Sequence, residues 1–309
     1  MNNLKALRYF VAVVNAGSFT GAASVVAVAQ PALTRQIREL EETLGVLLLE
    51  RLPRGVRMTA SGVTLYESAQ KILSESDRVT KNLREGLTET PGVNLGVPPT
   101  LGRVLLPGLF ESSLRLPGAL PMRAREAFTP ALLEWLERGI IDMAIVTNPP
   151  FGKRFSLRPL VNEPFGLITL KKKGQPDVIH IEQLVEIPVL MTSLHHGIVD
   201  QQLRDLNLKL RIEGIIDSVD AIRELVLKRG HATIMPVSVF KNDHSSDPTQ
   251  ISQITGVQLS RTLVLAQPRD RDQMTNYGIV EQLIESEFSR LERLGAFSAS
   301  PYRDSSSAT

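Results

Sequence analysis

The sequence predicts a multidomain protein: an all-α winged helix-turn-helix region with a long linker helix behind it, followed by an α/β region. Apolar residues at helical spacing mark three short helices and one long helix within residues 4–87, with a β-prone stretch before the long one. From residue 93 onward strand-like and helix-like segments alternate, which is typical of a mainly parallel, doubly wound sheet. A chain of 309 residues is long enough for two domains.

The first two helices are short and amphipathic. Residues 4–15 carry apolar side chains at spacings of three and four, and Gly17 ends this helix. Ser18 stands at the N-cap position of a second helix over residues 19–26. The side chains that we expect in the core of this region are Leu7, Phe10, Ala22, Ala23, Leu33, Ile37 and Leu40.

A third helix and a hairpin complete the N-terminal domain. Residues 31–44 are amphipathic and are followed by Gly45, which suits a helix end. Residues 47–59 are β-prone on both sides of Arg54-Gly55, a pair that suits a hairpin tip. Three helices followed by a hairpin predict a winged helix-turn-helix domain over residues 1–60.

A long helix is expected over residues 61–87, because apolar side chains continue along one stripe. At ~1.5 Å per residue it would be a rod of roughly 40 Å. A lone rod with an apolar stripe usually pairs with another helix, so we expect a dimerisation helix. The dimerisation helix and its hinge take up residues 61–92, with a linker at 88–92 that contains Pro91-Gly92.

The α/β region is expected to fill residues 93–297, and the tail, 298–309, is expected to be disordered. The expected strands are 93–97, 143–147, 165–170, 189–192, 232–235 and 262–266. The expected helices are 101–116, 130–138, 199–207, 220–228 and 279–294.

Composition excludes several classes of protein. No apolar run approaches the ~18 residues that a membrane span needs, and the N-terminus lacks a secretory signal pattern, so we expect a cytoplasmic protein without membrane contact. Cysteine is absent, which excludes disulfides and thiol redox sensing. Five scattered histidines make a metal site improbable. Residues 1–60 carry seven Lys or Arg against four Glu, whereas the remainder carries 28 against 29 Asp or Glu, so the positive excess lies where a phosphate-contacting module would need it.

The N-terminal segments resemble those of LysR-type transcription regulators. The matching segments are 7–13, 17–20, Ala22-Ala23, 30–37, Leu40-Glu41, Leu44-Gly45, Glu50-Arg51, 54–59 and Gly62. A weaker likeness continues through 96–102, Glu126 with Thr129, 136–139, 142–145 and 217–219. Residues 98–100, 148–150 and His196-Gly197 resemble the subgroup that contains nitrogen-assimilation regulators.

The resemblance implies a sequence-specific regulator whose effector domain is periplasmic-binding-protein-like. Subdomain I would comprise 93–161 and 267–297, and subdomain II would comprise 162–266. It further implies a homodimer or homotetramer on an inverted-repeat operator in double-stranded DNA, a small-molecule effector and contact with RNA polymerase.

The predicted DNA contacts begin at the N-terminal part of the third helix, which enters the major groove in helix-turn-helix proteins. The exposed residues there are Gln30, Pro31, Thr34, Arg35 and Arg38. Gln can pair with adenine and Arg with guanine, so base readout is expected at Gln30 and Arg35. The alternative is that these side chains form a solvated helix face.

The wing arginines Arg51, Arg54 and Arg57 are expected against the DNA backbone or minor groove, and Thr20 is a further contact from the matching segment 17–20. The alternative for each arginine is a local salt bridge. Two positions depart from the family pattern: Gly21 stands where Arg is common, and Ala29 where Ser or Thr is common. The first departure loses a charge and the second a cap or hydroxyl contact, so DNA affinity or half-site preference is expected to change.

The effector site is expected at the carboxyl ends of strands, where helix N-termini offer free N–H groups to anions. An anion is therefore one candidate effector, and no cofactor is expected. The candidate residues are Thr100, Leu101, Thr129, Thr147, Asn148, Ser193, His195 and His196. Simple N-capping would explain Thr100 and Thr129 equally well. The two histidines could titrate near neutral pH, but functionless loop histidines are as common.

Two other classes remain as alternatives. A small-molecule enzyme of α/β fold would need a catalytic motif, and the sequence contains no nucleophile elbow, phosphate-binding loop or zinc-binding helix, so no catalytic residues are expected. A solute-binding protein would need a signal peptide and no DNA-binding head, and this chain has the reverse.

Overall fold

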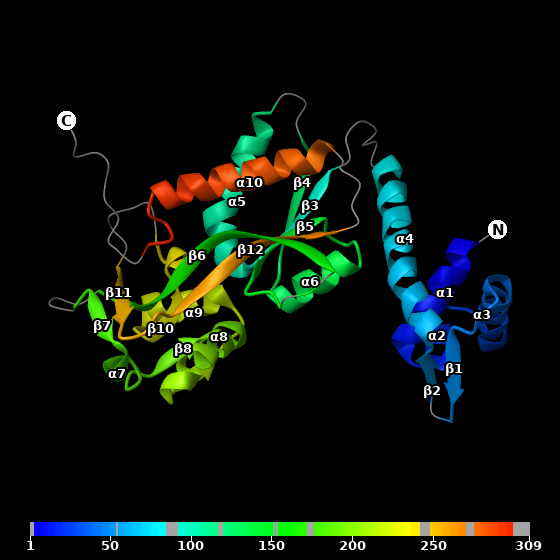
Figure 1. Ribbon diagram of the computed structural model, residues 1–309, viewed down its shortest axis with the longest axis horizontal. Coiled ribbons are helices and arrows are strands. Elements are labelled where there is room, and N and C mark those ends of the chain that lie inside the picture. The colour runs from blue at the N-terminus through cyan, green and yellow to red at the C-terminus, as the bar shows by residue number, and fades with distance from the viewer. Residues whose placement is uncertain are drawn as a thin grey trace. The chain divides into compact units, whose positions relative to one another are not determined.

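A computed structural model (Figure 1) describes most of the chain, and its residues fall into two compact units. The described residues are 3–53, 55–84, 92–116, 120–150, 152, 154–171, 176–241, 248–269 and 275–298. One unit comprises residues 1–90 with 134–141, and the other comprises 91–133 with 142–309.

Three helices and a hairpin build the first unit. Helices α1 (Asn3–Ala16), α2 (Phe19–Val25) and α3 (Gln30–Leu44) enclose a core to which all three contribute. Strands β1 (Leu49–Leu52) and β2 (Gly55–Met58) pair in antiparallel fashion, and helix α4 (Ala60–Arg84) follows. Every residue predicted as core is buried: Leu7, Phe10, Ala22, Ala23, Leu33, Ile37 and Leu40.

Local sequence signals explain the ends of these helices. The Ser18 hydroxyl accepts a hydrogen bond from the Gly21 N–H at 3.1 Å and caps α2. Gly45 has a φ of 70°, the left-handed conformation that suits the residue after a helix, and its N–H bonds to the Glu41 carbonyl. The expected positions of all three helices and of the hairpin are confirmed to within about two residues.

The first half of the second unit is a three-strand parallel sheet. Strands β3 (Val93–Val97), β4 (Met122–Glu126) and β5 (Met143–Thr147) alternate with helices α5 (Pro99–Leu114) and α6 (Thr129–Glu137), of which residues 134–137 are grouped with the first unit. Side chains of α5 and of α10 (Thr275–Arg293) pack against one face of this sheet around a leucine-rich core.

Two long antiparallel strands connect the halves of this unit. Strand β6 (Phe155–Leu170) pairs through its first part with β12 (Ser260–Pro268), which also pairs with β5. The last part of β6 pairs instead with β10 (Ala232–Pro236) and β11 (Thr249–Thr255). The strand order is therefore β4-β3-β5-β12-β6-β10-β8-β9, and residues 161 and 162, where a change of subdomain was expected, both lie inside β6.

The second half of the unit repeats the parallel arrangement. Strands β8 (Val189–Met191) and β9 (Ile212–Ile215) are parallel to β10, with helix α8 (Ser193–Leu203) on one face and α9 (Val219–Arg229) on the other. The short β7 (Val178–His180) pairs with β11, and α7 (Ile181–Leu184) follows it.

The expected strands near 93, 143, 189, 232 and 262 and the helices near 101, 130, 220 and 279 are confirmed, with small shifts of their ends. Strands β4, β7, β9 and β11 were not anticipated, and β6 begins ten residues earlier than expected. The helix expected over residues 199–207 begins instead at Ser193. The expected disorder of the tail concerns residues that, after Ser298, lie outside the described part of the chain.

Candidate functional sites

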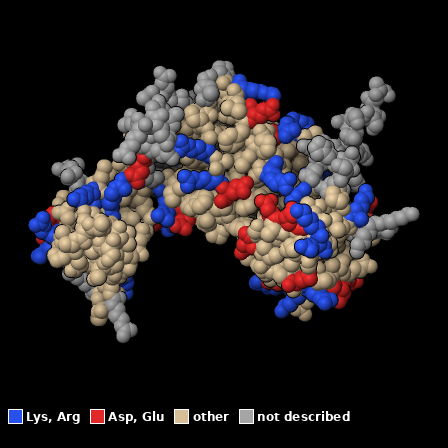
Figure 2. All heavy atoms as spheres, turned by 180° about the vertical axis from the view of Figure 1, so that it is seen from behind, with Lys and Arg blue, Asp and Glu red and all other residues tan. Residues whose placement is uncertain are grey.

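The start of α3 presents an exposed polar surface. Gln30, Pro31, Arg35 and Arg38 are exposed and Thr34 is half-buried, as expected for a helix that could enter a groove. The Gln30 amide donates to the Thr34 hydroxyl at 3.3 Å. Figure 2 shows Lys and Arg side chains along the margin of this unit, at the left of the view.

Each arginine of α3 has an acidic partner one turn further along. Arg35 and Glu39 are 3.3 Å apart, and Arg38 and Glu42 are 3.2 Å apart. Exposed pairs of this kind contribute at most ~1 kcal/mol, so a phosphate or base edge can replace the glutamate at little cost. The N-cap of the same helix is Ala29, which makes no side-chain hydrogen bond, so the expected loss of a cap at this position is confirmed.

The wing carries one described arginine side chain. Arg57 donates through Nε and Nη2 to Glu50 Oε2, at 3.0 and 2.6 Å, across the β1–β2 hairpin. The local salt bridge considered as the alternative for Arg57 is therefore present, on an exposed surface. The Arg51 side chain and Arg54 lie outside the described residues. Thr20 is exposed in the first turn of α2.

Backbone contacts hold the wing against the helices. The Val56 N–H donates to the Gly17 carbonyl at 3.0 Å, and a Cβ on Gly55 would overlap the same carbonyl oxygen. Glu41 Oε1 accepts from the N–H groups of Leu48 and Leu49. Sequence reasoning noted Glu41 as part of the resemblance but gave it no role, since a glutamate near a helix end carries no signal of its partner.

In the second unit, the carboxyl ends of the parallel strands gather several of the predicted effector residues. Thr100 and Leu101 lie in the first turn of α5 and are buried. Thr129 begins α6, and its hydroxyl donates to the Thr147 carbonyl at 3.1 Å and accepts from the Thr147 N–H at 2.9 Å. The Thr147 hydroxyl is buried without a hydrogen-bond partner.

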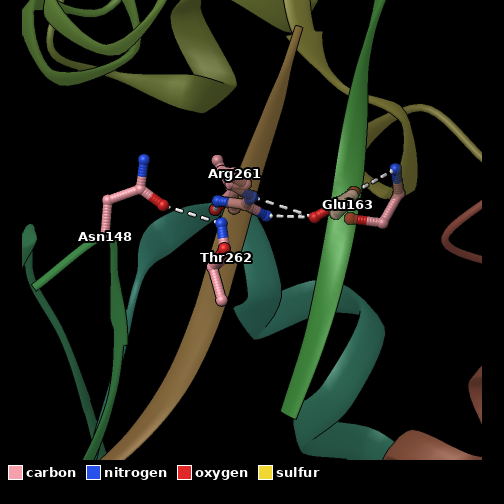
Figure 3. Close-up of polar contacts among 6 residues, drawn as sticks. Asn148, Glu163, Arg261 and Thr262 are labelled. Carbon is pink, nitrogen blue, oxygen red and sulfur yellow. Dashed lines mark hydrogen bonds and ion pairs between the residues drawn. The ribbon is translucent and has the colours of Figure 1, made fainter. Parts of the chain in front are cut away.

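Asn148 follows β5 and joins it to β12. Its side-chain oxygen accepts from the Thr262 N–H at 2.7 Å (Figure 3). The Asn148 backbone N–H donates to the Thr262 carbonyl at 3.0 Å. Asn148 has a φ of 42°, a left-handed conformation that asparagine tolerates better than most residues.

A buried ion pair that sequence reasoning did not anticipate lies beside Thr100. Arg261 in β12 donates through Nε and Nη2 to Glu163 Oε2 in β6, at 2.9 and 2.7 Å (Figure 3). The exposed fractions of Arg261 and Glu163 are 1% and 0%. Arg261 Nη1 donates to the Thr100 hydroxyl at 2.7 Å, and Glu163 Oε1 accepts from the Ser238 N–H at 2.8 Å.

This network joins both halves of the unit. Thr100 belongs to α5 in the first half, and Ser238 follows β10 in the second half. The two charged residues are 98 positions apart but directly opposite in the β6–β12 register, and no short motif in the sequence brings such residues together.

The residues predicted from the second half begin α8. The Ser193 N–H and hydroxyl both donate to Asp217 at 2.8 Å. His195 is buried, its Nδ1 lies 2.9 Å from the Thr192 hydroxyl, and its ring meets the edge of Phe165. Burial and the charge of Arg261 hold the pKa of His195 well below its usual range. Both alternatives considered for His195, a group that titrates near neutral pH and an exposed loop residue without function, are therefore wrong. His196 is half-buried in the same helix.

Among the described residues, no group of three or more His, Cys, Asp or Glu side chains could hold a metal ion. Within the same residues, no helix combines the length and the apolar character needed to cross a bilayer.

Comparisons with known proteins agree with this architecture. Residues 4–63 match the model of the bacterial regulatory helix-turn-helix proteins of the lysR family, and residues 88–285 match the LysR substrate binding domain. A winged helix-turn-helix joined to such a domain defines a DNA-binding transcription regulator with an effector-binding domain. The chain belongs to the LysR family.

Individual relatives cover most of the chain. It is 30% identical over 270 residues to the hydrogen peroxide-inducible genes activator of Haemophilus influenzae. The matched region covers 85% of this chain and 89% of that protein. It is 31% identical over 263 residues to the transcriptional regulator BenM of Acinetobacter baylyi, or 85% and 77% of the two chains. The solved structure of full-length CbnR with its target DNA has a TM-score of 0.55 at 21% identity, covering 92% of this chain and 99% of that one. The nitrogen-assimilation subgroup stays a prediction.

Proposed function

We propose that this regulator reads its operator through the start of α3 and changes its action on transcription when a small molecule binds in the second unit. The observation that carries the DNA-reading part is the exposed polar surface at the start of α3, where Gln30 and Arg35 are both exposed and lie five positions apart in the helix. Gln pairs with adenine and Arg with guanine in the major groove. Thr34 and Arg38 would contact phosphates beside them, and Pro31 would pack against the groove.

The wing would add contacts that position the protein without specifying sequence. Arg57 is exposed and exchanges a weak surface partner for a phosphate at little cost. Arg51, Arg54 and Thr20 complete the proposed DNA contacts.

Helix α4 would join two copies of the chain. Val63, Ile72 and Val79 on this helix are 43 to 46% exposed, which supports a partner helix over them. A two-fold dimer would present paired recognition helices to an inverted repeat, and two dimers would make a tetramer. Such a regulator would act on chromosomal DNA in the cytoplasm and recruit RNA polymerase.

The effector would lie at the carboxyl ends of β3, β4 and β5, between two subdomains joined by β6 and β12. The unpartnered hydroxyl of Thr147 and the short polar network around Thr100 support this position. Thr129, Asn148, Ser193, Leu101 and His196 would line or shape the same region. We place the domain limits at residues 1–60, 61–92 and 93–297.

The relative from Haemophilus influenzae is named for genes induced by hydrogen peroxide, and we do not propose a peroxide response for this chain. The 309 residues contain no cysteine, so peroxide finds no thiol to oxidise. The relatives are transcription regulators rather than enzymes, and we propose no catalytic activity.

Selection of bound duplexes from a random pool would identify the operator, and a titration against operator and scrambled DNA would then test Arg35→Ala. Removing a base contact should weaken operator binding by ~1 to 3 kcal/mol while leaving binding to scrambled DNA nearly unchanged. Arg115→Ala is the matched control: its side chain is 76% exposed, as is that of Arg35, and pairs with a glutamate four residues away in α5. Equal discrimination by wild type and Arg35→Ala would contradict the base contact.

A further inference from the structure

The charges around Thr100 constrain the kind of effector that this site can take, an inference that rests on the effector position proposed above. Arg261 supplies a buried positive charge next to Thr100, but two of its N–H groups already bond to Glu163. Both members of the pair are fully buried and close in register. The positive charge of Arg261 is therefore compensated by the chain itself before any ligand arrives.

The second positive feature is the start of α5, because a helix N-terminus carries a partial positive charge. The Glu126 carboxylate lies against Gly102 in the first turn of this helix, so closely that a Cβ on Gly102 would overlap Glu126 Oε1. Glu126 is exposed, and partial burial together with the nearby charge of Asp220 raises its pKa, because further negative charge is disfavoured in this region. The N-terminus of α5 therefore faces the Glu126 carboxylate, just as Arg261 faces that of Glu163.

Two cations from the second half of the unit, Lys241 and Arg223, already have partners within the chain. The Lys241 ammonium group donates to the Gly295 carbonyl. Arg223 donates to the Val239 carbonyl at 2.9 Å and lies over the Phe240 ring. A charged ligand would need one of these cations to leave its partner, whereas an uncharged ligand would not.

The hydroxyl groups of the site also differ in what they can offer. The Thr129 hydroxyl uses its proton on the Thr147 carbonyl, so toward a ligand it can act only as an acceptor. The Thr100 hydroxyl accepts from Arg261, and its own proton has no acceptor within the part of the chain that the structure describes. A hydroxyl that accepts from a guanidinium is polarised and becomes a better donor.

We propose that the effector presents an uncharged hydrogen-bond acceptor, such as an amide, ketone or hydroxyl oxygen, to the Thr100 hydroxyl, and that the site discriminates against a carboxylate at this position. A carboxylate there would be taken out of water near Glu163 and Glu126, while Arg261, the cation that contacts Thr100, is already paired with Glu163, so its burial would be costly. An uncharged oxygen satisfies the Thr100 proton without that cost.

Matched pairs of compounds test the proposal on the full-length protein. Benzamide with benzoate and 2-methylpropanamide with 2-methylpropanoate differ in charge but little in shape, and ligand-detected NMR titration would give their affinities. We expect both amides to bind about tenfold or more tightly than their carboxylate partners, a ratio that corresponds to ~1.4 kcal/mol. Thr100→Val should abolish amide binding, whereas Thr100→Ser, which keeps the hydroxyl, should retain it.

Glu126→Gln provides a second variant outside the buried ion pair. Removing this negative charge should improve carboxylate binding and narrow the ratio between the members of each pair. Thr100-dependent binding of the carboxylates in preference to the amides would overturn the charge inference and leave the effector site in place. If neither amide binds, the inference about charge is wrong. If the amides bind equally well to wild type and to Thr100→Val, the inference is wrong and the result also counts against the proposed effector site.

Discussion

Glu41 in helix α3 and Leu48 just ahead of the wing are joined by a hydrogen bond of 2.7 Å from the Leu48 N–H to Glu41 Oε1. The Leu49 N–H donates to the same oxygen at 3.1 Å. One carboxylate oxygen therefore ties the helix that carries Arg35 to the first wing strand. Because both donors are backbone groups, the contact fixes the path of the chain into β1 and with it the position of Arg57.

Glu41→Ala should weaken DNA binding, although Glu41 itself is not among the proposed DNA contacts. The substitution leaves two partly buried N–H groups unpaired, which costs ~1 to 3 kcal/mol of stability and releases the wing. Glu41→Gln keeps an acceptor oxygen at the same place and should behave nearly as wild type. The measurement is the salt dependence of DNA affinity, whose slope should fall only in Glu41→Ala as wing phosphate contacts are lost.

The same pair of variants separates positioning from general destabilisation. A variant that is merely less stable loses affinity in proportion to the unfolded fraction and keeps the wild-type salt slope. An unchanged slope in Glu41→Ala at a temperature where it is fully folded would contradict the positioning role.

How far the fold could be predicted from sequence depends on how local its signals are. The three N-terminal helices carry caps and periodic apolar residues within themselves, so Ser18 and Gly45 indicated their ends correctly. Strand β4, in contrast, reads Met-Arg-Ala-Arg-Glu and has an edge position in the sheet, where exposed charged side chains are tolerated and the apolar pattern is lost. Strand β6 changes partners midway, and this change of pairing leaves no local mark.

The site divides in the same way. Thr100 and Thr129 could be anticipated because each opens a helix after a strand or turn, a local feature. Arg261 and Glu163 could not, because their pairing depends on the register of two strands from distant parts of the chain. His195 was placed in a loop because the start of α8 lacks a strong apolar periodicity, and the structure buries it instead.

The buried ion pair should be costly to break from one side. Arg261→Met would leave the Glu163 carboxylate buried without its cation and should lower the free energy of unfolding by ~3 to 5 kcal/mol. Converting both residues to Met removes both charges and should cost much less than the sum of the two single changes. Chemical denaturation of the full-length variants provides the double-mutant cycle, and additive effects would contradict direct coupling between the two side chains.

Ala29→Ser should stabilise helix α3. The backbone at Ala29 already has the extended N-cap conformation, with φ −66° and ψ 133°, so a serine oxygen could accept from the Ala32 N–H, the capping donor that remains because Pro31 has no N–H. The expected gain is ~0.5 to 2 kcal/mol. Ser18→Ala, which removes the existing cap of α2, is the reverse control and should lose a similar amount. Ser18→Ala should lower the melting temperature, and Ala29→Ser should raise it. A lower melting temperature for Ala29→Ser as well would contradict the proposed capping gain.

His195 should make the protein less stable in mild acid. Its pKa is lowered in the folded state by burial, with the charge of Arg261 adding to the effect, whereas in the unfolded chain it is near 6.5. Below pH ~6.5 the unfolded state therefore binds a proton at His195 that the folded state does not bind. Stability is lost as the pH falls from about 6.5 toward the pKa of His195 in the folded state, by up to ~1.4 kcal/mol per pH unit. His195→Gln does not titrate there, and the difference between its unfolding free energy and that of wild type, measured from pH 7.5 down to about 5, should shrink or reverse as the pH falls. Parallel curves for the two proteins would show that His195 is not the group responsible.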